Sequence, residues 1–158
     1  MSTDSRETWK AVFDMIEQIH HVAILTKDIE AAVDHYVDML GCERKEPLIV
    51  EKPGLRWRSV LLPIGNGTTA LQLIEPLEGP GVEQLRLGGE GTLFEIGFAC
   101  TDVEAFGSHL QQREIAPSDL TENALQEKYL QSKYGNRFYI VPPENSRGTR
   151  LEFVQFCS

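Results

Sequence analysis

The sequence predicts an α+β fold in which two tandem βαβββ modules form a curved mixed sheet, shaped as a cup with helices outside, after an N-terminal helix. Two observations support this prediction. The hydrophobic pattern changes twice from strand to helix and back to three strands. Short motifs of the first half also recur in the second half in the same order, which indicates an internal duplication.

The N-terminal helix is expected over residues 1–18, because Trp9, Val12, Phe13 and Ile16 are spaced for one helical face. The first module, residues 19–77, begins with a mostly apolar strand at 19–26. A helix is expected to follow, beginning at the acidic residues Asp28 and Glu30 and ending at a glycine cap, Gly41. Three further strands are expected near 44–51, 56–62 and 69–74, with glycine-rich turns between them.

The second module is expected over residues 92–158, after a glycine-rich linker at 78–91. The segment 102–106 repeats the start of the first helix 74 positions later, and the strands at 137–142 and 149–154 repeat earlier strands 79 and 80 positions later. The offset grows from 74 to 80, so the second module has about six additional residues, which we place within 118–136. Thr101 and Glu104 are spaced for a capping box at the start of the second helix.

The composition is that of a globular protein with ample apolar material for a core. The chain has 158 residues, of which 41% are hydrophobic, and a net charge of −9. The acidic balance argues against a nucleic-acid partner, and no apolar run is long enough to cross a membrane. Three dispersed cysteines without metal-ligand spacing are typical of free thiols, so a cytoplasmic location is expected.

Four polar residues occupy matching positions of the two modules. His21 and Glu95 are repeat mates on the first strand of each module, and Gln72 and Glu152 are mates on the last strand. Each interrupts an apolar strand, so all four are expected to converge on one concave face. An imidazole, an amide oxygen and two carboxylates suit one divalent ion: Mn, Co, Ni, Mg or Zn. The alternative is that they are ordinary polar residues on a solvated sheet face.

Three arginines are candidate substrate-binding residues. Alternation places Arg58 and Arg150 on the concave face, and Arg137 is the repeat mate of Arg58. Their guanidinium groups suit a carboxylate, phosphate or polyhydroxylated substrate, or they balance the acidic ligands as solvated strand residues. His20 is expected to point away from His21, which disfavours a clamp made of both histidines.

From residue 19 to residue 156 the sequence resembles the vicinal oxygen chelate superfamily, the glyoxalase, bleomycin resistance and dioxygenase proteins. The resemblance rests on the strand that begins at His21, on Leu71-Gln72-Leu-Ile-Glu-Pro-Leu, and on the run from Asn136 through Glu152. Methylmalonyl-CoA epimerases are the most similar members in these motifs. The resemblance implies a glyoxalase-type fold, metal ligands at His21, Gln72 and Glu152, and a homodimer.

Two positions depart from the epimerase pattern. Glu95 stands where the family has a second histidine, and Arg58 stands where the epimerases have a carboxylate base. Arginine stays protonated and cannot act as that base. Glu95 and Glu152 are then the candidate catalytic carboxylates, and either could leave the metal to move the proton. We favour Glu152 as the steady ligand and Glu95 as the base, and the sequence leaves open whether Glu95 is a ligand, a base or both.

The sequence thus predicts a metal-dependent epimerase or isomerase that moves a proton beside the carbonyl of a small oxygenated substrate, an acyl-CoA or a sugar-like ketone. A glyoxalase-type lyase that acts on a thiol adduct uses the same proton shuttle and remains open. So do a non-catalytic drug-binding or resistance protein and a glutathione- or fosfomycin-linked transferase. An iron dioxygenase is disfavoured because it normally uses two histidines.

Overall fold

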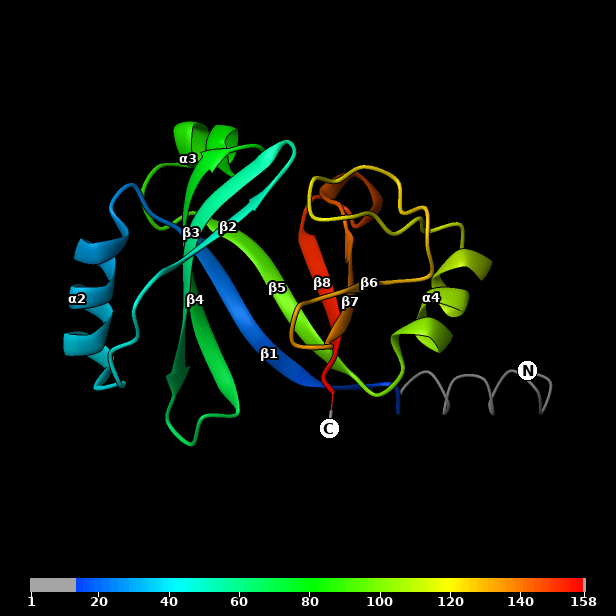
Figure 1. Ribbon diagram of the computed structural model, residues 1–158, viewed down its shortest axis with the longest axis horizontal. Helices are drawn as coiled ribbons and strands as arrows, with labels where there is room; N and C mark the ends of the chain where they lie inside the picture. The colour runs from blue at the N-terminus through cyan, green and yellow to red at the C-terminus, as the bar shows by residue number, and fades with distance from the viewer. Residues whose placement is uncertain (1–13, 158) are drawn as a thin grey trace. The chain divides into compact units, whose positions relative to one another are not determined.

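The computed structural model describes residues 14–157, and Figure 1 shows the order of their helices and strands. The chain divides into two compact units. One comprises His20–Ile96, and the other comprises the residues before His20 together with those from Gly97 onward. Residues 1–13, which hold most of the predicted N-terminal helix, lie outside the described part of the chain.

Four strands build the sheet of the unit His20–Ile96, in the order β2-β3-β4-β1. Their bounds are Ile16–Leu25 for β1, Leu48–Lys52 for β2, Leu55–Ile64 for β3 and Thr69–Glu78 for β4. β3 pairs antiparallel with β2 and β4, whereas β1 pairs parallel with β4. A parallel pair needs a crossover connection, which the helix α2 (Ile29–Leu40) and the β2–β3 hairpin provide.

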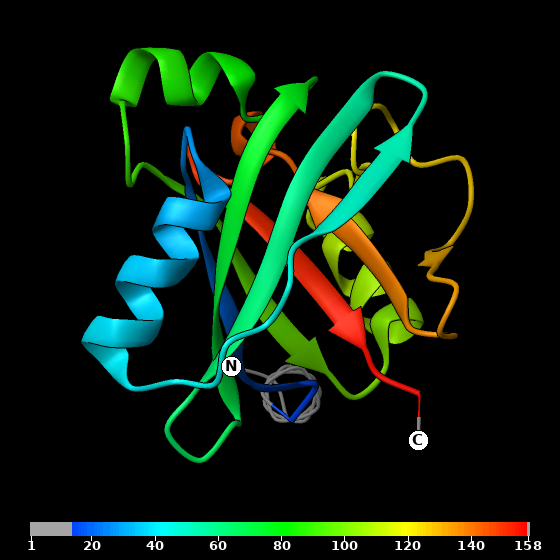
Figure 2. The ribbon, with the colours of Figure 1, turned by 60° about the vertical axis from the view of Figure 1, so that its left-hand side comes forward.

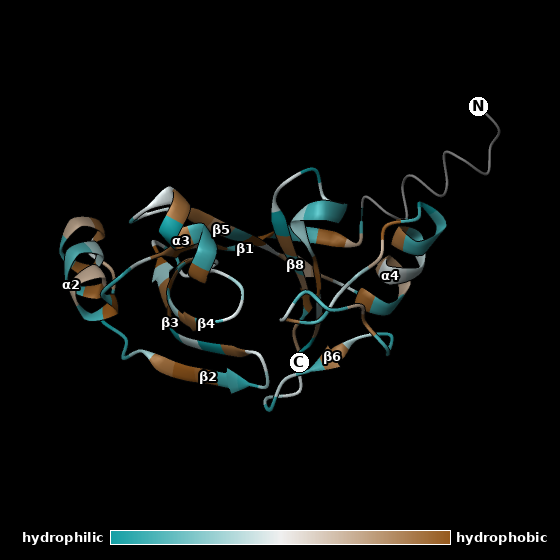
Figure 3. Ribbon diagram, turned by 90° about the horizontal axis from the view of Figure 1, so that it is seen from above, coloured by the Kyte–Doolittle hydropathy of each residue, from teal (hydrophilic) through white to brown (hydrophobic). Residues whose placement is uncertain are grey.

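Helix α2 covers one face of this sheet, as Figure 2 shows. The Asp28 side chain caps its N-terminus by accepting a hydrogen bond from the Ala31 backbone, and Gly41 ends it at a left-handed φ of 68°. The colours of Figure 3 show that α2 is amphipathic. Its buried side packs on alternate residues of β3 and β4. The core is Ile29, Ala32, Val33, Val60, Leu62 and Leu73. The other sheet face is therefore free to carry polar residues.

The second unit repeats this arrangement with shorter strands. β5 (Leu93–Cys100) leads into α4 (Val103–Gln112), which is followed by β6 (Leu130–Gln131), β7 (Arg137–Val141), a 3₁₀ turn (Pro143–Asn145) and β8 (Arg150–Gln155). β7 pairs antiparallel with β6 and β8. Three aromatic side chains, Phe106, Tyr139 and Phe153, pack together in the core beneath α4. The predicted α+β class and both βαβββ series are therefore present.

The internal repeat extends to strand register. Gln72 of β4 lies opposite Leu61 of β3, and Glu152 of β8 lies opposite Ile140 of β7. Leu61 and Ile140 are themselves repeat mates, 79 positions apart. The duplication that the sequence predicts is thus visible in the pairing of the backbone.

Three local predictions were wrong or incomplete. β1 already begins at Ile16, so the last three residues of the predicted N-terminal helix are strand. Asp102, rather than Thr101, caps α4, because its carboxylate accepts from the Ala105 backbone. The linker contains a short helix, α3 (Val82–Gly88), whose entry glycines take positive φ angles. In the described part of the chain, no helix has the length and apolar character to cross a membrane.

Candidate metal centre

A buried pair, His21 of β1 and Glu95 of β5, lies within the unit His20–Ile96. The His21 Nε2 and Glu95 Oε2 atoms are 3.2 Å apart, and both residues are less than 5% exposed. Strand alternation explains the position of His21, because Ile24 of β1 packs toward α2 and His21 has the opposite parity. The two repeat mates are therefore in direct contact, as their expected convergence requires, and their role as metal ligands stays a prediction.

Gln72 lies on the same sheet face as His21. β1 and β4 run parallel with His21 beside Ala70 and Ala23 beside Gln72, so Gln72 follows His21 by one step along this face. The Gln72 Oε1 atom is buried, and no hydrogen-bond donor reaches it among the residues that the structure describes. A buried amide oxygen without a donor is uncommon and calls for a further electropositive partner.

This donor set fits a divalent cation. Two ligand atoms that bind one ion at about 2.1 Å and at right angles lie about 3 Å apart. The separation of His21 Nε2 and Glu95 Oε2 matches that spacing. A cation would also satisfy the amide oxygen of Gln72, which accepts but cannot donate. Imidazole, amide and carboxylate together suit metals of intermediate hardness.

His20 contacts His21 in a way that strand alternation did not predict. The two rings are nearly perpendicular, at 87°, and their Nδ1 atoms are 3.0 Å apart. His20 is half-buried, and this burial, followed by the neighbouring His21, lowers the pKa of the His20 imidazole. The neutral ring is therefore favoured. Both nitrogen atoms of His21 thus lie near a polar group, Nδ1 near His20 and Nε2 near Glu95.

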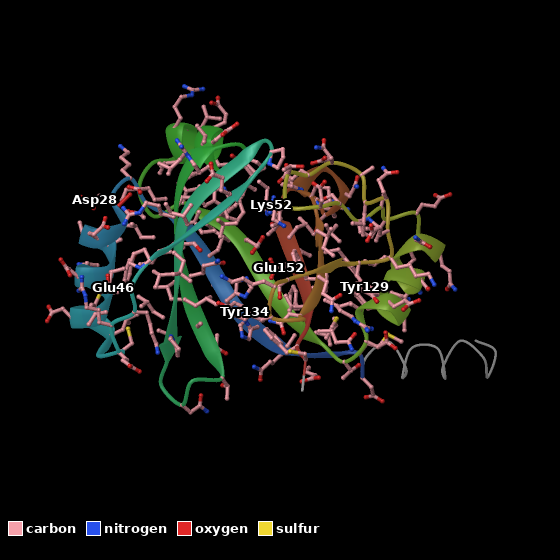
Figure 4. All side chains as sticks on the ribbon, viewed as in Figure 1. Asp28, Glu46, Lys52, Tyr129, Tyr134 and Glu152 are labelled. Carbon is pink, nitrogen blue, oxygen red and sulfur yellow. The ribbon has the colours of Figure 1, made fainter. Side chains whose placement is uncertain are left out.

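Glu152, the fourth predicted ligand, lies on β8 of the other unit and is labelled in Figure 4. It is half-buried and pairs in register with Ile140. The neighbouring pair, Tyr139 and Phe153, packs toward α4, so alternation directs Glu152 to the face away from that helix. Its position in its own unit therefore corresponds to that of Gln72 in the other.

Arg58 does not lie on the face that carries Gln72, so that part of the prediction was wrong. It pairs in register with Glu75 and has the parity of Val60, which packs against α2. Its guanidinium group forms ion pairs with Glu30 of α2 and with Glu75. These carboxylates raise the pKa of Arg58 further above its ordinary value. The geometry gives no support to Arg58 as a substrate-binding residue.

Arg137 also lies on the helix side of its sheet. It has the parity of Tyr139, which packs beneath α4, and its guanidinium carbon lies 4.7 Å from the centre of the Tyr129 ring. This cation–π contact explains its orientation. Arg137 lines a shallow depression with Gln155 and Cys157, on the face opposite to Glu152. The repeat relation to Arg58 holds, but both arginines face outward.

Arg150 has the predicted parity, that of Glu152, but it is only 1% exposed. Its Nη1 donates to the Glu122 carboxylate at 3.0 Å, and its Nη2 donates to the Leu120 carbonyl at 3.1 Å. Both partners belong to the additional segment of the second module. Arg150 therefore anchors that segment, and a solvated substrate-binding role finds no support.

The comparisons with known proteins identify the family of the chain and relatives of its fold. The sequence profile of the Glyoxalase/Bleomycin resistance protein/Dioxygenase superfamily matches residues 20–127, more than half of the chain. A search of curated proteins gave no match. Among solved structures, a methylmalonyl-CoA epimerase variant from Streptomyces coelicolor in complex with 2-nitronate-propionyl-CoA is 25% identical, with a TM-score of 0.72 over 90% of this chain and 99% of that one.

Two further structures share the fold. Methylmalonyl-CoA epimerase from Mycobacterium tuberculosis is 20% identical, with a TM-score of 0.72 over 92% of this chain and 91% of that one. The hypothetical protein BH1468 from Bacillus halodurans C-125 is 20% identical, with a TM-score of 0.65 over 89% of this chain and 95% of that one. The relatives of named activity are thus enzymes of the superfamily that the sequence motifs indicated.

Proposed function

The chain belongs to the glyoxalase/bleomycin resistance/dioxygenase superfamily, and on that premise we propose that it is a metal-dependent epimerase or isomerase. In this proposal a proton moves to and from the carbon beside a carbonyl group of a small substrate. The observation that carries the proposal is the Gln72 Oε1 atom, which is buried and without a donor on the same sheet face as the buried His21–Glu95 pair.

His21, Gln72 and Glu152 would hold the ion, with Glu95 beside it. When bound, a divalent cation would supply Lewis-acid chemistry to oxygen atoms of the substrate. Support for Glu152 comes from its repeat relation to Gln72 and from the equivalent register of both residues in their strand pairs. The two carboxylates would balance the charge of the ion, which a buried cation requires.

Glu95 would be the base that removes the proton. Arg58 faces α2, and β3 contains no aspartate or glutamate anywhere along its length. The face of β3 that accompanies Gln72 carries Trp57, Ser59 and Leu61 instead. Glu95 is a carboxylate beside His21, and its burial would exclude water from the proton that it holds.

Acyl-CoA thioesters are the first substrates to test, because solved relatives are methylmalonyl-CoA epimerases, one of them in complex with 2-nitronate-propionyl-CoA. A thioester carbonyl acidifies the hydrogen on the adjacent carbon, which is the proton that the proposal moves. Small ketones with a neighbouring hydroxyl group have the same reactive arrangement and form the second class.

The metal site is tested by elemental analysis of protein purified without a metal-chelating tag. We expect about one equivalent of divalent ion in the wild type, and its loss in His21→Ala and Glu152→Ala. Exposed residues of the same types, in His35→Ala and Glu144→Ala, serve as matched controls that keep the ion. If the wild type takes up no Mn, Co, Ni, Mg or Zn, the enzyme proposal fails and a ligand-binding role becomes the better hypothesis.

The proton transfer is tested by exchange of substrate hydrogen with deuterium from the solvent. Metal-loaded wild type should catalyse exchange at the carbon beside the carbonyl, and Glu95→Gln should slow it by at least a hundredfold, within the usual contribution of a general base. Exchange that Glu95→Gln leaves unchanged would assign the base to another residue.

A further inference from the structure

We propose that His20 is a positioning residue that orients His21 and sets its tautomer for metal binding. This inference rests on the proposed metal site and adds a residue to it. The geometry behind it is the 3.0 Å approach of the Nδ1 atoms of the two histidines, with the rings at 87° to each other.

Two imidazole nitrogen atoms at hydrogen-bonding distance must have complementary roles. Two lone pairs, or two N–H groups, would repel each other at 3.0 Å, so one Nδ1 carries the hydrogen and the other accepts it. A neutral imidazole has one nitrogen of each kind, and therefore the role of one nitrogen determines the role of the other.

The direction of this hydrogen bond follows from the proposed site. His21 Nε2 is the nitrogen that faces Glu95, so it would be the metal-binding atom and must offer its lone pair. With an ion on Nε2, His21 Nδ1 must then carry the hydrogen, and His20 Nδ1 must accept it. Metal-binding histidines commonly donate their second N–H to an outer partner, which fixes the ring and increases its basicity.

The location of His20 suits this role. It directly precedes His21 in β1, so the two side chains start from adjacent Cα atoms, and their torsions bring the two Nδ1 atoms together. His20 is half-buried, which restricts its rotamers and limits competition from water for its Nδ1. Most outer partners of metal-binding histidines are carboxylates or carbonyl groups, and here a second imidazole would supply the acceptor.

A matched pair of substitutions separates hydrogen bonding from packing. In His20→Asn, the amide Oδ1 can occupy the position of the imidazole Nδ1 and accept the same hydrogen bond. In His20→Leu, the side chain has similar branching but no acceptor. Circular dichroism and thermal unfolding would check that both variants keep the fold.

Metal affinity and ring tautomer are the two measurements. In titrations with Zn²⁺ against a competing chelator, we expect His20→Leu to weaken binding by about 10- to 100-fold, the usual effect of removing an outer partner. His20→Asn should stay within about threefold of wild type. In ¹⁵N spectra of the Zn²⁺-loaded proteins, the imidazole hydrogen of His21 should be on Nδ1. This hydrogen should exchange rapidly with solvent only in His20→Leu, where it has lost its acceptor.

The outcomes distinguish this inference from the proposed function. Wild-type affinity in His20→Leu would overturn the role of His20 and leave the metal site intact. Equal losses in both variants, with the tautomer unchanged, would show a packing effect and also overturn it. Absence of metal binding by the wild type would overturn the site itself, and the positioning role with it.

Discussion

The strand pairs β3–β4 and β7–β8 have equivalent registers but carry different side chains at equivalent positions. On β4, Ala70 lies beside His21 and is followed on the same face by Gln72. On β8 the corresponding residues are Arg150 and Glu152, 80 positions later. A small residue and an amide in one module thus correspond to a guanidinium and a carboxylate in the other.

This difference shows that the two modules share their strand register more closely than their polar side chains. Register depends on which face of a strand is apolar, and a shift by one residue would expose every core side chain. Polar side chains on the opposite face are under no such restriction. Arg150 illustrates this freedom, because it is buried against Glu122 and Leu120, in the segment that lengthens the second module.

The largest expected effect comes from Arg150→Met, which removes the cation beneath the additional segment. The Glu122 carboxylate and the Leu120 carbonyl would lose their donor, so the free energy of unfolding should fall by about 3 kcal/mol. Urea denaturation measures this loss. Arg58→Met is the matched control, because its ion pairs are solvated, and its effect should be much smaller. Equal losses would contradict the contrast between the modules.

Alkaline pH should affect the second unit before the first. Burial raises the pKa of the Cys100 thiol to about 12 from 9.0, and burial also raises the pKa of Tyr139. Because the folded pKa lies above the unfolded one, the neutral thiol favours folding below pH 9, and this stability is lost as pH rises toward 12. We expect a loss of roughly 1–2 kcal/mol by pH 11.

Cys100→Ala removes this contribution and serves as the control. Its free energy of unfolding should be lower than that of wild type at pH 8, and it should decline less between pH 9 and pH 11. Parallel pH profiles for the two proteins would show that Cys100 does not cause the alkaline loss. Amide hydrogen exchange resolved by segment would show which unit opens first as the pH rises.

Gln72→Leu should change stability and metal binding in opposite directions. Replacing a buried amide oxygen that lacks a donor removes an unsatisfied polar group, so the metal-free protein should gain about 1 kcal/mol in unfolding free energy. Metal affinity should fall at the same time, because one donor is lost. Chemical denaturation with and without added ion measures both changes. A destabilised metal-free variant would contradict the assignment of Oε1 as unsatisfied.

The two helix caps should have the smallest and most similar effects. Asp28 and Asp102 are repeat mates, and each accepts one hydrogen bond from the backbone three residues later. Asp28→Ala and Asp102→Ala should each lower the free energy of unfolding by about 1 kcal/mol. Thermal unfolding of the single variants measures this. A much larger loss for one cap would show that the modules differ in local stability as well as in side-chain chemistry.

Much of the fold could be predicted because it depends on local patterns. Apolar alternation and helical spacing identified the strands and helices of both modules, and Gly41 ends α2 as its position suggested. The repeat offset also paired His21 with Glu95 across 74 residues, and the two are hydrogen-bonded neighbours. Because the two modules repeat, the sequence offset alone was enough to predict this long-range contact.

Other features depended on contacts that no local pattern encodes. The face of Arg58 was predicted wrongly, and its ion partners, Glu30 and Glu75, come from a helix and from the neighbouring strand. His20 was expected to point away from His21. The side-chain torsions of the two residues bring their Nδ1 atoms together, and strand parity describes only the Cα–Cβ direction.

The sequence by itself determined the α+β class, the order of the elements, the duplication and the residues of a candidate metal centre, because these follow from periodicity and from side-chain chemistry. The tertiary structure decided which polar groups are buried, paired or without a donor. Burial and hydrogen bonding depend on what lies beside a residue in space, so only the folded chain could show Arg150 anchoring the additional segment and Gln72 lacking a donor.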